Sequence, residues 1–185
     1  MDTRKARTWA EVSLGALRHN VAEMQRALPD GCGLLGVVKA DAYGHGASEI
    51  AAALRECGCR YLAVACPQEA LALRQAGETM PILILGAVDA AFASDMAAND
   101  ITLSVECAEK GRALSAALRG GERLRIHLKL DTGMGRLGFR VQDETALREA
   151  AAAAQLPNLD AEGVFTHFSV SDTPGEEEYT AAQLA

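Results

Sequence analysis

A lysine placed directly after a short apolar run is the residue of this sequence that could most directly do chemistry. Lys39 ends the run at residues 34–38 and begins a turn at residues 40–46. Such a run is typical of a strand buried on both faces of a parallel sheet, where chemistry lies at the carboxyl ends of the strands. Desolvation there lowers a lysine pKa and frees an amine that can form an imine. The alternative is that the aliphatic stem packs while the ammonium group reaches solvent.

A second polar cluster lies on another expected strand, residues 124–131. Apolar and polar side chains alternate along it, so that His127, Lys129 and Asp131 share one face. A strand inside a parallel sheet should be apolar on both faces. Two interpretations stay open: an edge strand with Lys129 and Asp131 paired in solvent, or a strand whose polar face lines a site.

A glycine-rich loop with the sequence Thr-Gly-Met-Gly-Arg-Leu-Gly follows at residues 132–138. Its glycines let the backbone approach a ligand closely, and Arg136 offers an anion a planar cation with five donors. The glycine spacing does not match a dinucleotide-binding fingerprint, and no triphosphate-binding loop occurs in the sequence. We therefore expect a loop that presents Arg136 to some other anion.

His167 ends the last expected strand, residues 161–167. The carboxyl ends of parallel strands meet at one edge of a sheet, so Lys39, Arg136 and His167 are expected on the same rim. A single histidine at such a place is more often structural than catalytic. The sequence contains no H-x-H or H-E-x-x-H spacing, so we expect no metal site.

The elements that must position these residues alternate between strands and helices. Six apolar runs predict strands at residues 34–38, 61–66, 81–85, 101–105, 124–130 and 161–167. Ser13 should cap a helix with apolar residues at 3-4-3-4 spacing, and Pro67 should lie in the first turn of another. Asp143 should cap an alanine-rich helix that stops before Pro157.

Single helices between strands predict βα units and a parallel sheet in one domain, residues 1–185. An eight-stranded βα barrel typically needs ~250 residues. The 185 residues here predict either an open doubly wound sheet of six strands or the first three quarters of a barrel. The sequence stops within a helical pattern at residues 179–185, so we expect it to be a truncated piece.

The composition excludes several classes of protein. There are 18 Lys and Arg against 25 Asp and Glu, giving a net charge of -7 without the basic stripe that nucleic-acid binding needs. No apolar run approaches the roughly 18 residues of a membrane span, and residues 1–7 lack the apolar region of a signal peptide. Five cysteines without paired spacing predict reduced thiols in a cytoplasmic protein.

These patterns together resemble a known family. The sequence Val-Val-Lys-Ala-Asp-Ala-Tyr-Gly-His-Gly at residues 37–46 resembles the cofactor-lysine signature of the bacterial alanine racemases, which use pyridoxal 5'-phosphate on a βα barrel. Further stretches agree in order and spacing at residues 7–11 with 17–20, 128–139, 166–168 and 183. The resemblance covers the whole sequence.

The resemblance implies an α/β fold: a (β/α)8 TIM-type barrel, here incomplete with about six βα units and without the C-terminal β-domain. It also implies a cytoplasmic homodimeric isomerase that interconverts L- and D-alanine and supplies D-alanine for peptidoglycan. Serine is an alternative small amino-acid substrate. Neither nucleic acid nor a membrane segment is implied.

The resemblance further implies roles for five residues. Lys39 would hold the cofactor as an imine and act as one of two opposed bases at the α-carbon. Tyr43 would bind the cofactor phosphate, and Arg136 would face the phenolic oxygen of the cofactor and the substrate carboxylate. Lys129 resembles a lysine that is often carbamylated and then orients the arginine. His167 would pack near the pyridine ring.

The rest of the family's site lies in a half that this sequence lacks, including the tyrosine that serves as second base. Neither Tyr61 nor Tyr179 lies in the context of that tyrosine. We therefore expect the isolated piece to bind cofactor weakly and to be inactive alone. The rival interpretations are an amino-acid decarboxylase of the same barrel group and a non-enzymatic pyridoxal-phosphate-binding barrel protein.

Overall fold

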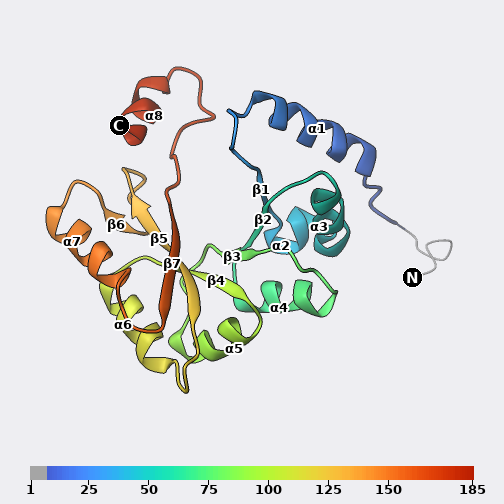
Figure 1. Ribbon diagram of the computed structural model, residues 1–185. Coiled ribbons are helices and arrows are strands. Elements are labelled where there is room, and N and C mark those ends of the chain that lie inside the picture. Colours follow the sequence, from blue (N-terminus) through green and yellow to red (C-terminus); the bar gives the residue numbers. More distant parts are fainter. Residues whose placement is uncertain (1–7) are drawn as a thin grey trace. The chain divides into compact units, whose positions relative to one another are not determined.

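The computed structural model describes residues 8–185, and Figure 1 shows the order of their helices and strands. Residues 1–7, which include the charged N-terminus and the first residue of the Arg7–Glu11 resemblance, lie outside the described part. The chain divides into two compact units, one ending at Ile82 and the other beginning at Leu83. The expectation of a single domain stays a prediction.

The first unit begins with a helix whose N-cap is the predicted residue Ser13. Its elements are α1 (Leu14–Ala27), β1 (Leu35–Val37), α2 (Lys39–Gly44), α3 (Ala47–Glu56), β2 (Tyr61–Val64) and α4 (Pro67–Gln75). The Ser13 side chain accepts a hydrogen bond from the Ala16 amide at 3.2 Å, which confirms the predicted cap. Pro67 is the first residue of α4, also as predicted.

Strands β1 and β2 pair in parallel, with Gly36 opposite Leu62 in the register. The β2 residues Leu62, Ala63 and Val64 are fully buried, so this strand is the core of the first unit. Burial of the Leu62 and Val64 side chains contributes about 1.5–3 kcal/mol each. The chain then enters β3 (Ile82–Ile84) at the junction between the units.

Strand β1 differs from the prediction of burial on both faces. Leu35 and Val37 are 39% and 38% exposed, although Val38 is 1% exposed. Among the described strands β1 pairs only with β2, and Val37 lines a cavity of about 370 Å³ that α1 also borders. Val37 is therefore accessible to solvent through this cavity and is not packed against a second layer of the described residues.

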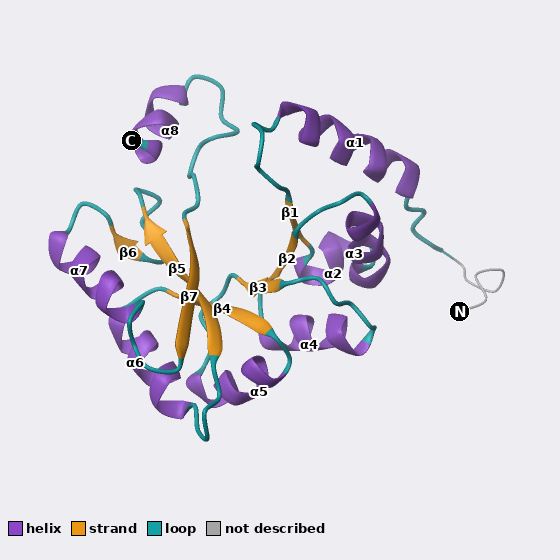
Figure 2. Cartoon of the chain, viewed as in Figure 1, coloured by secondary structure: helices purple, strands orange, loops and turns teal. Residues whose placement is uncertain are grey.

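The second unit is built around β5. Its elements are a short 3-10 turn (Ala90–Phe92), α5 (Ala93–Ala98), β4 (Ile101–Val105), α6 (Ala108–Ala117), β5 (Leu124–Asp131), β6 (Phe139–Arg140), α7 (Glu144–Ala153), β7 (Leu159–Phe165) and α8 (Glu177–Leu184). Strand β5 pairs in parallel with β4, β6 and β7, while α5, α6 and α7 lie on one side of these strands (Figure 2).

All six predicted strands are present, and the two-residue β6 is an addition that no apolar run announced. The Asp143 carboxylate accepts from the amides of Thr145 at 2.8 Å and Ala146 at 3.4 Å, which confirms the predicted cap of α7. None of the described helices combines the length and the apolar character that a membrane crossing requires.

Candidate active site

Lys39 directly precedes a turn with an unusual backbone conformation. The four residues after it, Ala40, Asp41, Ala42 and Tyr43, all have φ between 51° and 55°, in the left-handed helical region. Each non-glycine residue in this conformation costs about 1–2 kcal/mol. A run of four therefore needs support from the surrounding structure.

Asp41 supplies part of that support through its backbone and its side chain. Its carbonyl accepts from the Gly46 amide at 3.0 Å, and its carboxylate accepts from the Ala47 amide at 2.7 Å, where α3 begins. The Ala42 amide donates to the Val38 carbonyl at 2.9 Å. The turn is thus fastened to the end of β1 on one side and to α3 on the other.

The turn brings together two of the predicted site residues. The Lys39 ammonium nitrogen lies 5.9 Å from the centroid of the Tyr43 ring, which is 59% exposed. The Lys39 side chain is half-buried. A primary amine and a phenolic hydroxyl are therefore presented side by side at the carboxyl end of β1, where a small molecule can reach both.

In the second unit, Lys129 and Asp131 are 5% and 7% exposed. Strand β5 has neighbours on both sides, so the edge-strand interpretation with a solvent-exposed pair is wrong. The Lys129 nitrogen lies over the Phe165 ring, 4.8 Å from its centroid, and donates to the Leu130 carbonyl at 3.3 Å. The polar face of β5 is therefore an interior surface.

The surroundings of Lys129 lower the pKa of its ammonium group. Burial lowers the pKa of its ammonium group, the positive charge of Arg136 lowers it further, and Asp131 opposes both. The folded state thus favours the neutral amine more than the unfolded chain does. A neutral amine is the form that can react as a nucleophile.

Asp131 holds the loop that carries Arg136. One of its carboxylate oxygens accepts from the amides of Gly133 at 3.0 Å and Gly135 at 2.9 Å. Burial acts to raise the pKa of Asp131, but these two amides and Lys129 bring it below its ordinary value. The carboxylate stays ionised and anchors the loop, while Arg136 itself is exposed.

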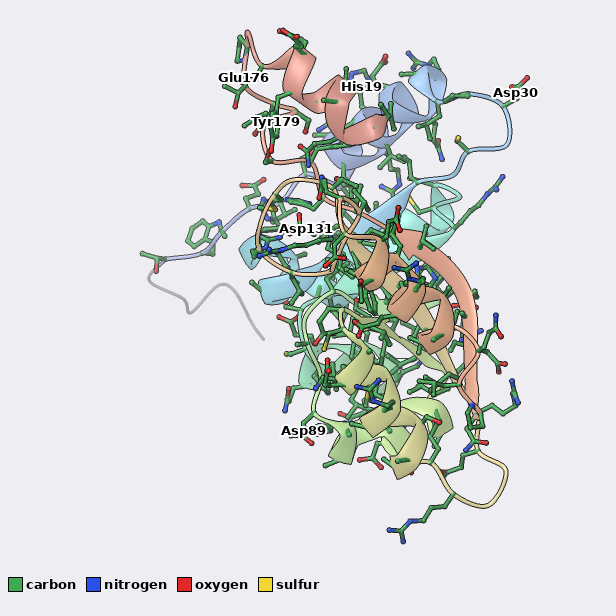
Figure 3. All side chains as sticks on the ribbon, turned by 90° about the vertical axis from the view of Figure 1, so that its left-hand side faces the viewer. His19, Asp30, Asp89, Asp131, Glu176 and Tyr179 are labelled. Carbon is green, nitrogen blue, oxygen red and sulfur yellow. The ribbon has the colours of Figure 1, made fainter. Side chains whose placement is uncertain are left out.

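Helix α8 contacts the same loop through Tyr179 and Gln183; Tyr179 and Asp131 are labelled in Figure 3. The Tyr179 hydroxyl donates to the Gly133 carbonyl at 2.7 Å. Gln183 is 6% exposed, donates to the Thr132 hydroxyl at 3.2 Å and accepts from the Ser169 amide at 3.0 Å. Sequence patterns did not assign this anchoring role to Tyr179, because a single tyrosine in a short helix carries no signal for it.

His167 lies beyond the end of β7 with an exposed side chain. Its carbonyl accepts from the Gln183 amide nitrogen at 3.5 Å, so its backbone belongs to the network that α8 organises. This hydrogen bond is made by the backbone of His167 and leaves the chemical role of its side chain unassigned. Its proposed place near a cofactor ring therefore rests on the family resemblance.

Glu106, which no sequence pattern singled out, follows β4 at its carboxyl end. The pairing of Val105 with Leu128 places it level with Lys129 along the two strands. Burial raises the pKa of Glu106, and Lys110 opposes the shift. Its Oε2 atom is buried without a hydrogen-bond partner in the described part of the chain.

The structure thus forms two sets of candidate residues, Lys39 with Tyr43 in the first unit and Lys129 with Asp131 and Arg136 in the second. Each set lies at the carboxyl end of its strand, where βα folds carry their chemistry. Within residues 8–185 no group of three or more metal-ligating side chains is found.

Lys129 should make stability depend on alkaline pH. Because its folded-state pKa is lowered, the unfolded chain binds more protons, and stability should rise with pH from that lowered value toward about 10.4, the ordinary lysine value. Lys129→Met should flatten this slope in urea denaturation series. Lys110→Met is the matched control, since the Lys110 ammonium group bonds the Val88 carbonyl elsewhere in the unit. An unchanged slope in Lys129→Met would contradict the assignment.

Comparison with known proteins identifies the family of this arrangement. A family model described as "Alanine racemase, N-terminal domain" matches residues 12–185. The alanine racemase of Desulforamulus reducens is 41% identical over 177 residues, which cover 95% of this chain and 47% of that protein. The chain therefore spans about half the length of the curated relatives it matches.

Solved structures agree with these matches. An alanine racemase of Clostridium difficile 630 in complex with cycloserine superposes with a TM-score of 0.92 at 39% identity, over 97% of this chain and 49% of that one. A histidine racemase of Leuconostoc mesenteroides superposes with a TM-score of 0.82 at 31% identity, over 94% and 46%. The predicted fold, an incomplete βα barrel, is confirmed.

Proposed function

Because this chain belongs to the alanine racemase family, we propose that Lys39 binds pyridoxal 5'-phosphate and that the protein containing the chain interconverts L- and D-alanine. The observation that carries the proposal is the placement of the Lys39 amine beside Tyr43 on the strained turn after β1. An aldehyde cofactor needs a primary amine, and its phosphate needs a donor nearby. This donor set fits the group.

Pyridoxal phosphate, when bound, supplies an electron-accepting ring that stabilises negative charge at the substrate α-carbon. Lys39 would hold the cofactor through its side-chain nitrogen and would carry the α-proton on one face of the substrate. Tyr43 would donate its hydroxyl to the cofactor phosphate, and Arg136 would bind the substrate carboxylate through its planar pair of donors. His167 would pack near the cofactor ring.

Lys129 has a supporting role in this proposal. Its lowered pKa favours the neutral amine, which is the form that reacts with carbon dioxide to give a carbamate. The nitrogen–carbon bond forms as one C=O π bond of carbon dioxide opens onto oxygen and one proton leaves to water, so the neutral amine becomes an anion. Counted from the ammonium form, two protons have left. That anion would attract and orient Arg136, whereas the unmodified ammonium group repels it. Burial beside Phe165 protects the product from water.

The remaining parts of the proposal concern the longer protein. The second base at the α-carbon comes from the half that the relatives possess beyond this region. We propose a cytoplasmic homodimer that supplies D-alanine for peptidoglycan, on the basis of the family resemblance. Alanine is the preferred substrate because the relatives reported above are mostly alanine racemases, with serine or another amino acid as the alternative in view of the histidine racemase.

Borohydride trapping tests the cofactor site directly. The sequence has only four lysines, at positions 5, 39, 110 and 129. Incubation of the chain with pyridoxal phosphate, then reduction and peptide mass spectrometry, should place the label on Lys39. Lys129→Met should keep the label and Lys39→Met should lose it. Labelling at Lys129 instead, or of no lysine, would refute the proposal.

A further inference from the structure

The carboxylate of Glu69 joins the carboxyl ends of two neighbouring strands in the first unit. Its Oε1 atom accepts from the Ala40 amide at 2.7 Å, and its Oε2 atom accepts from the Ala65 amide at 2.7 Å. Ala40 follows Lys39 directly, and Ala65 follows β2 directly. One side chain from α4 therefore ties together the point where the lysine turn begins and the strand beside it.

The place of Glu69 in α4 makes this bridge unusual. The helix begins at Pro67 after the N-cap residue Cys66, whose side chain makes no capping bond, so Glu69 is the third helical residue. A glutamate at this position ordinarily folds back onto the amide of the N-cap residue. Here it reaches past that residue to Ala65 and across to Ala40. Its two oxygens are committed to strand ends and not to the start of its own helix.

The lysine turn needs this acceptor. Ala40 is the first of the four residues in the left-handed region, and its amide lies just beyond the end of β1, where φ changes from negative to positive. Hydrogen bonds to a carboxylate are shorter and stronger than those between neutral groups. With the Ala40 amide fixed, the direction of the bond from the Lys39 backbone to its side chain is fixed as well.

We propose that Glu69 is a positioning residue for Lys39, holding the left-handed turn so that the lysine amine leaves β1 in one direction. The role of Lys39 as the cofactor amine rests on the proposed function, whereas the bridge itself does not. Glu69 touches neither substrate nor cofactor in this proposal. It acts only through the backbone of the turn.

Amide hydrogen exchange tests the bridge without any cofactor. In Glu69→Gln the side chain keeps its size but has one accepting oxygen and an amide group that cannot accept. We expect exchange at Ala40 or Ala65 to be at least about tenfold faster than in the parent, the factor for one lost charged hydrogen bond. Glu49→Gln is the matched control, because Glu49 holds the third position of α3 and bridges no strand ends among the described residues. Unchanged exchange at both alanines would overturn the proposal.

The consequence for Lys39 needs a second readout. With pyridoxal phosphate, the rate of borohydride-trapped labelling at Lys39 and the pH midpoint of the visible cofactor band should both change in Glu69→Gln and stay at parent values in Glu49→Gln. In the longer protein, kcat should fall by roughly tenfold or more while KM changes little, as expected for lost alignment of a reacting group. A residue that only stabilises the fold would lower the melting temperature without moving the cofactor band.

The outcomes separate this proposal from the proposed function. If Lys39 of the parent chain takes no label, the proposed function fails, and the exchange experiment still decides the bridge. If Glu69→Gln speeds exchange at Ala40 but labels Lys39 at the parental rate with an unshifted band, positioning is refuted and the function stands. Should Glu69→Gln fail to fold, Glu69→Asp keeps both oxygens on a stem one methylene shorter. Glu69→Asp is then expected to exchange faster than the parent at Ala40 or Ala65 and to shift the labelling of Lys39, while Glu49→Gln stays at parental values. Parental values of Glu69→Asp in both readouts would overturn the proposal.

Discussion

Replacing Lys39 with alanine should abolish racemisation in the longer protein that contains this chain, by at least about 1000-fold in kcat/KM. The substitution removes both the amine that attaches the cofactor and one of the two groups that move the α-proton. The loss should appear as absent exchange of the alanine α-proton in deuterated water, followed by NMR. Restoration by added small amines would not be expected to reach the parental rate.

The same substitution should leave the fold almost unchanged. The Lys39 side chain is half-buried, and its one described contact is with the Tyr43 ring. Truncation of such a surface side chain usually alters stability by about 0.5 kcal/mol or less. Lys110→Ala is the matched control, because this lysine bonds only the Val88 carbonyl in the described contacts and lies outside both candidate sets. Activity of Lys39→Ala within tenfold of the parent would overturn the assignment.

The exchange assay also separates the rival interpretations. A decarboxylase of the same barrel group would release carbon dioxide from an amino acid, and a non-enzymatic carrier would take the label on Lys39 without exchanging any α-proton. A racemase exchanges the proton and inverts the configuration with no loss of carbon. Measuring the three products in one reaction, for alanine and for serine, identifies the class and the preferred substrate together.

Gly138→Ala should lower the free energy of unfolding of the second unit by about 3–5 kcal/mol. Gly138 has φ of 126°, and an added Cβ would lie 2.7 Å from the Lys129 carbonyl oxygen and 2.8 Å from the Asp131 amide nitrogen. Those atoms belong to β5, which pairs with β4, β6 and β7 and cannot move aside. Urea denaturation measures the loss.

Gly135→Ala is the matched control in the same loop. Gly135 has φ of 72°, and an added Cβ would meet no atom within 4 Å. It should therefore cost only the conformational penalty, about 1–2 kcal/mol. Equal losses in the two variants would show that the close contact at Gly138 is relieved by movement of the loop. The rigid end of β5 would then be wrong as the reason that this glycine is needed.

Local patterns were enough to predict most of the elements and the residues with chemical potential. The caps at Ser13 and Asp143 depend on side chains and amides two or three residues apart, and the structure has both. The strand after which Lys39 stands follows from a short apolar run between turn residues. Family resemblance supplied the expected roles, because a ten-residue motif around the lysine is specific even where no single residue is.

Three features needed the folded chain. The sequence left Lys129 and Asp131 open between a solvent-exposed edge strand and an interior site. The strands on either side of β5 are distant from it in sequence, since Leu103 pairs with Ile126 and Leu159 pairs with Leu124. The sequence placed β1 inside a sheet, whereas Leu35 and Val37 stay exposed. No sequence pattern indicated that the Glu69 carboxylate bonds the amides of Ala40 and Ala65.

What the amino-acid sequence determined by itself is what short-range physics controls: where strands and helices begin, and which residue types stand at strand ends. Only the tertiary structure decided that Ala40 and its three successors turn left-handed, since alanine has no intrinsic preference for that conformation. Part of the support for this turn is local, from Asp41, and part comes from the Glu69 carboxylate, which lies 29 residues beyond Ala40 and accepts from its amide. Hydrogen bonds of that kind exist only after the chain has folded.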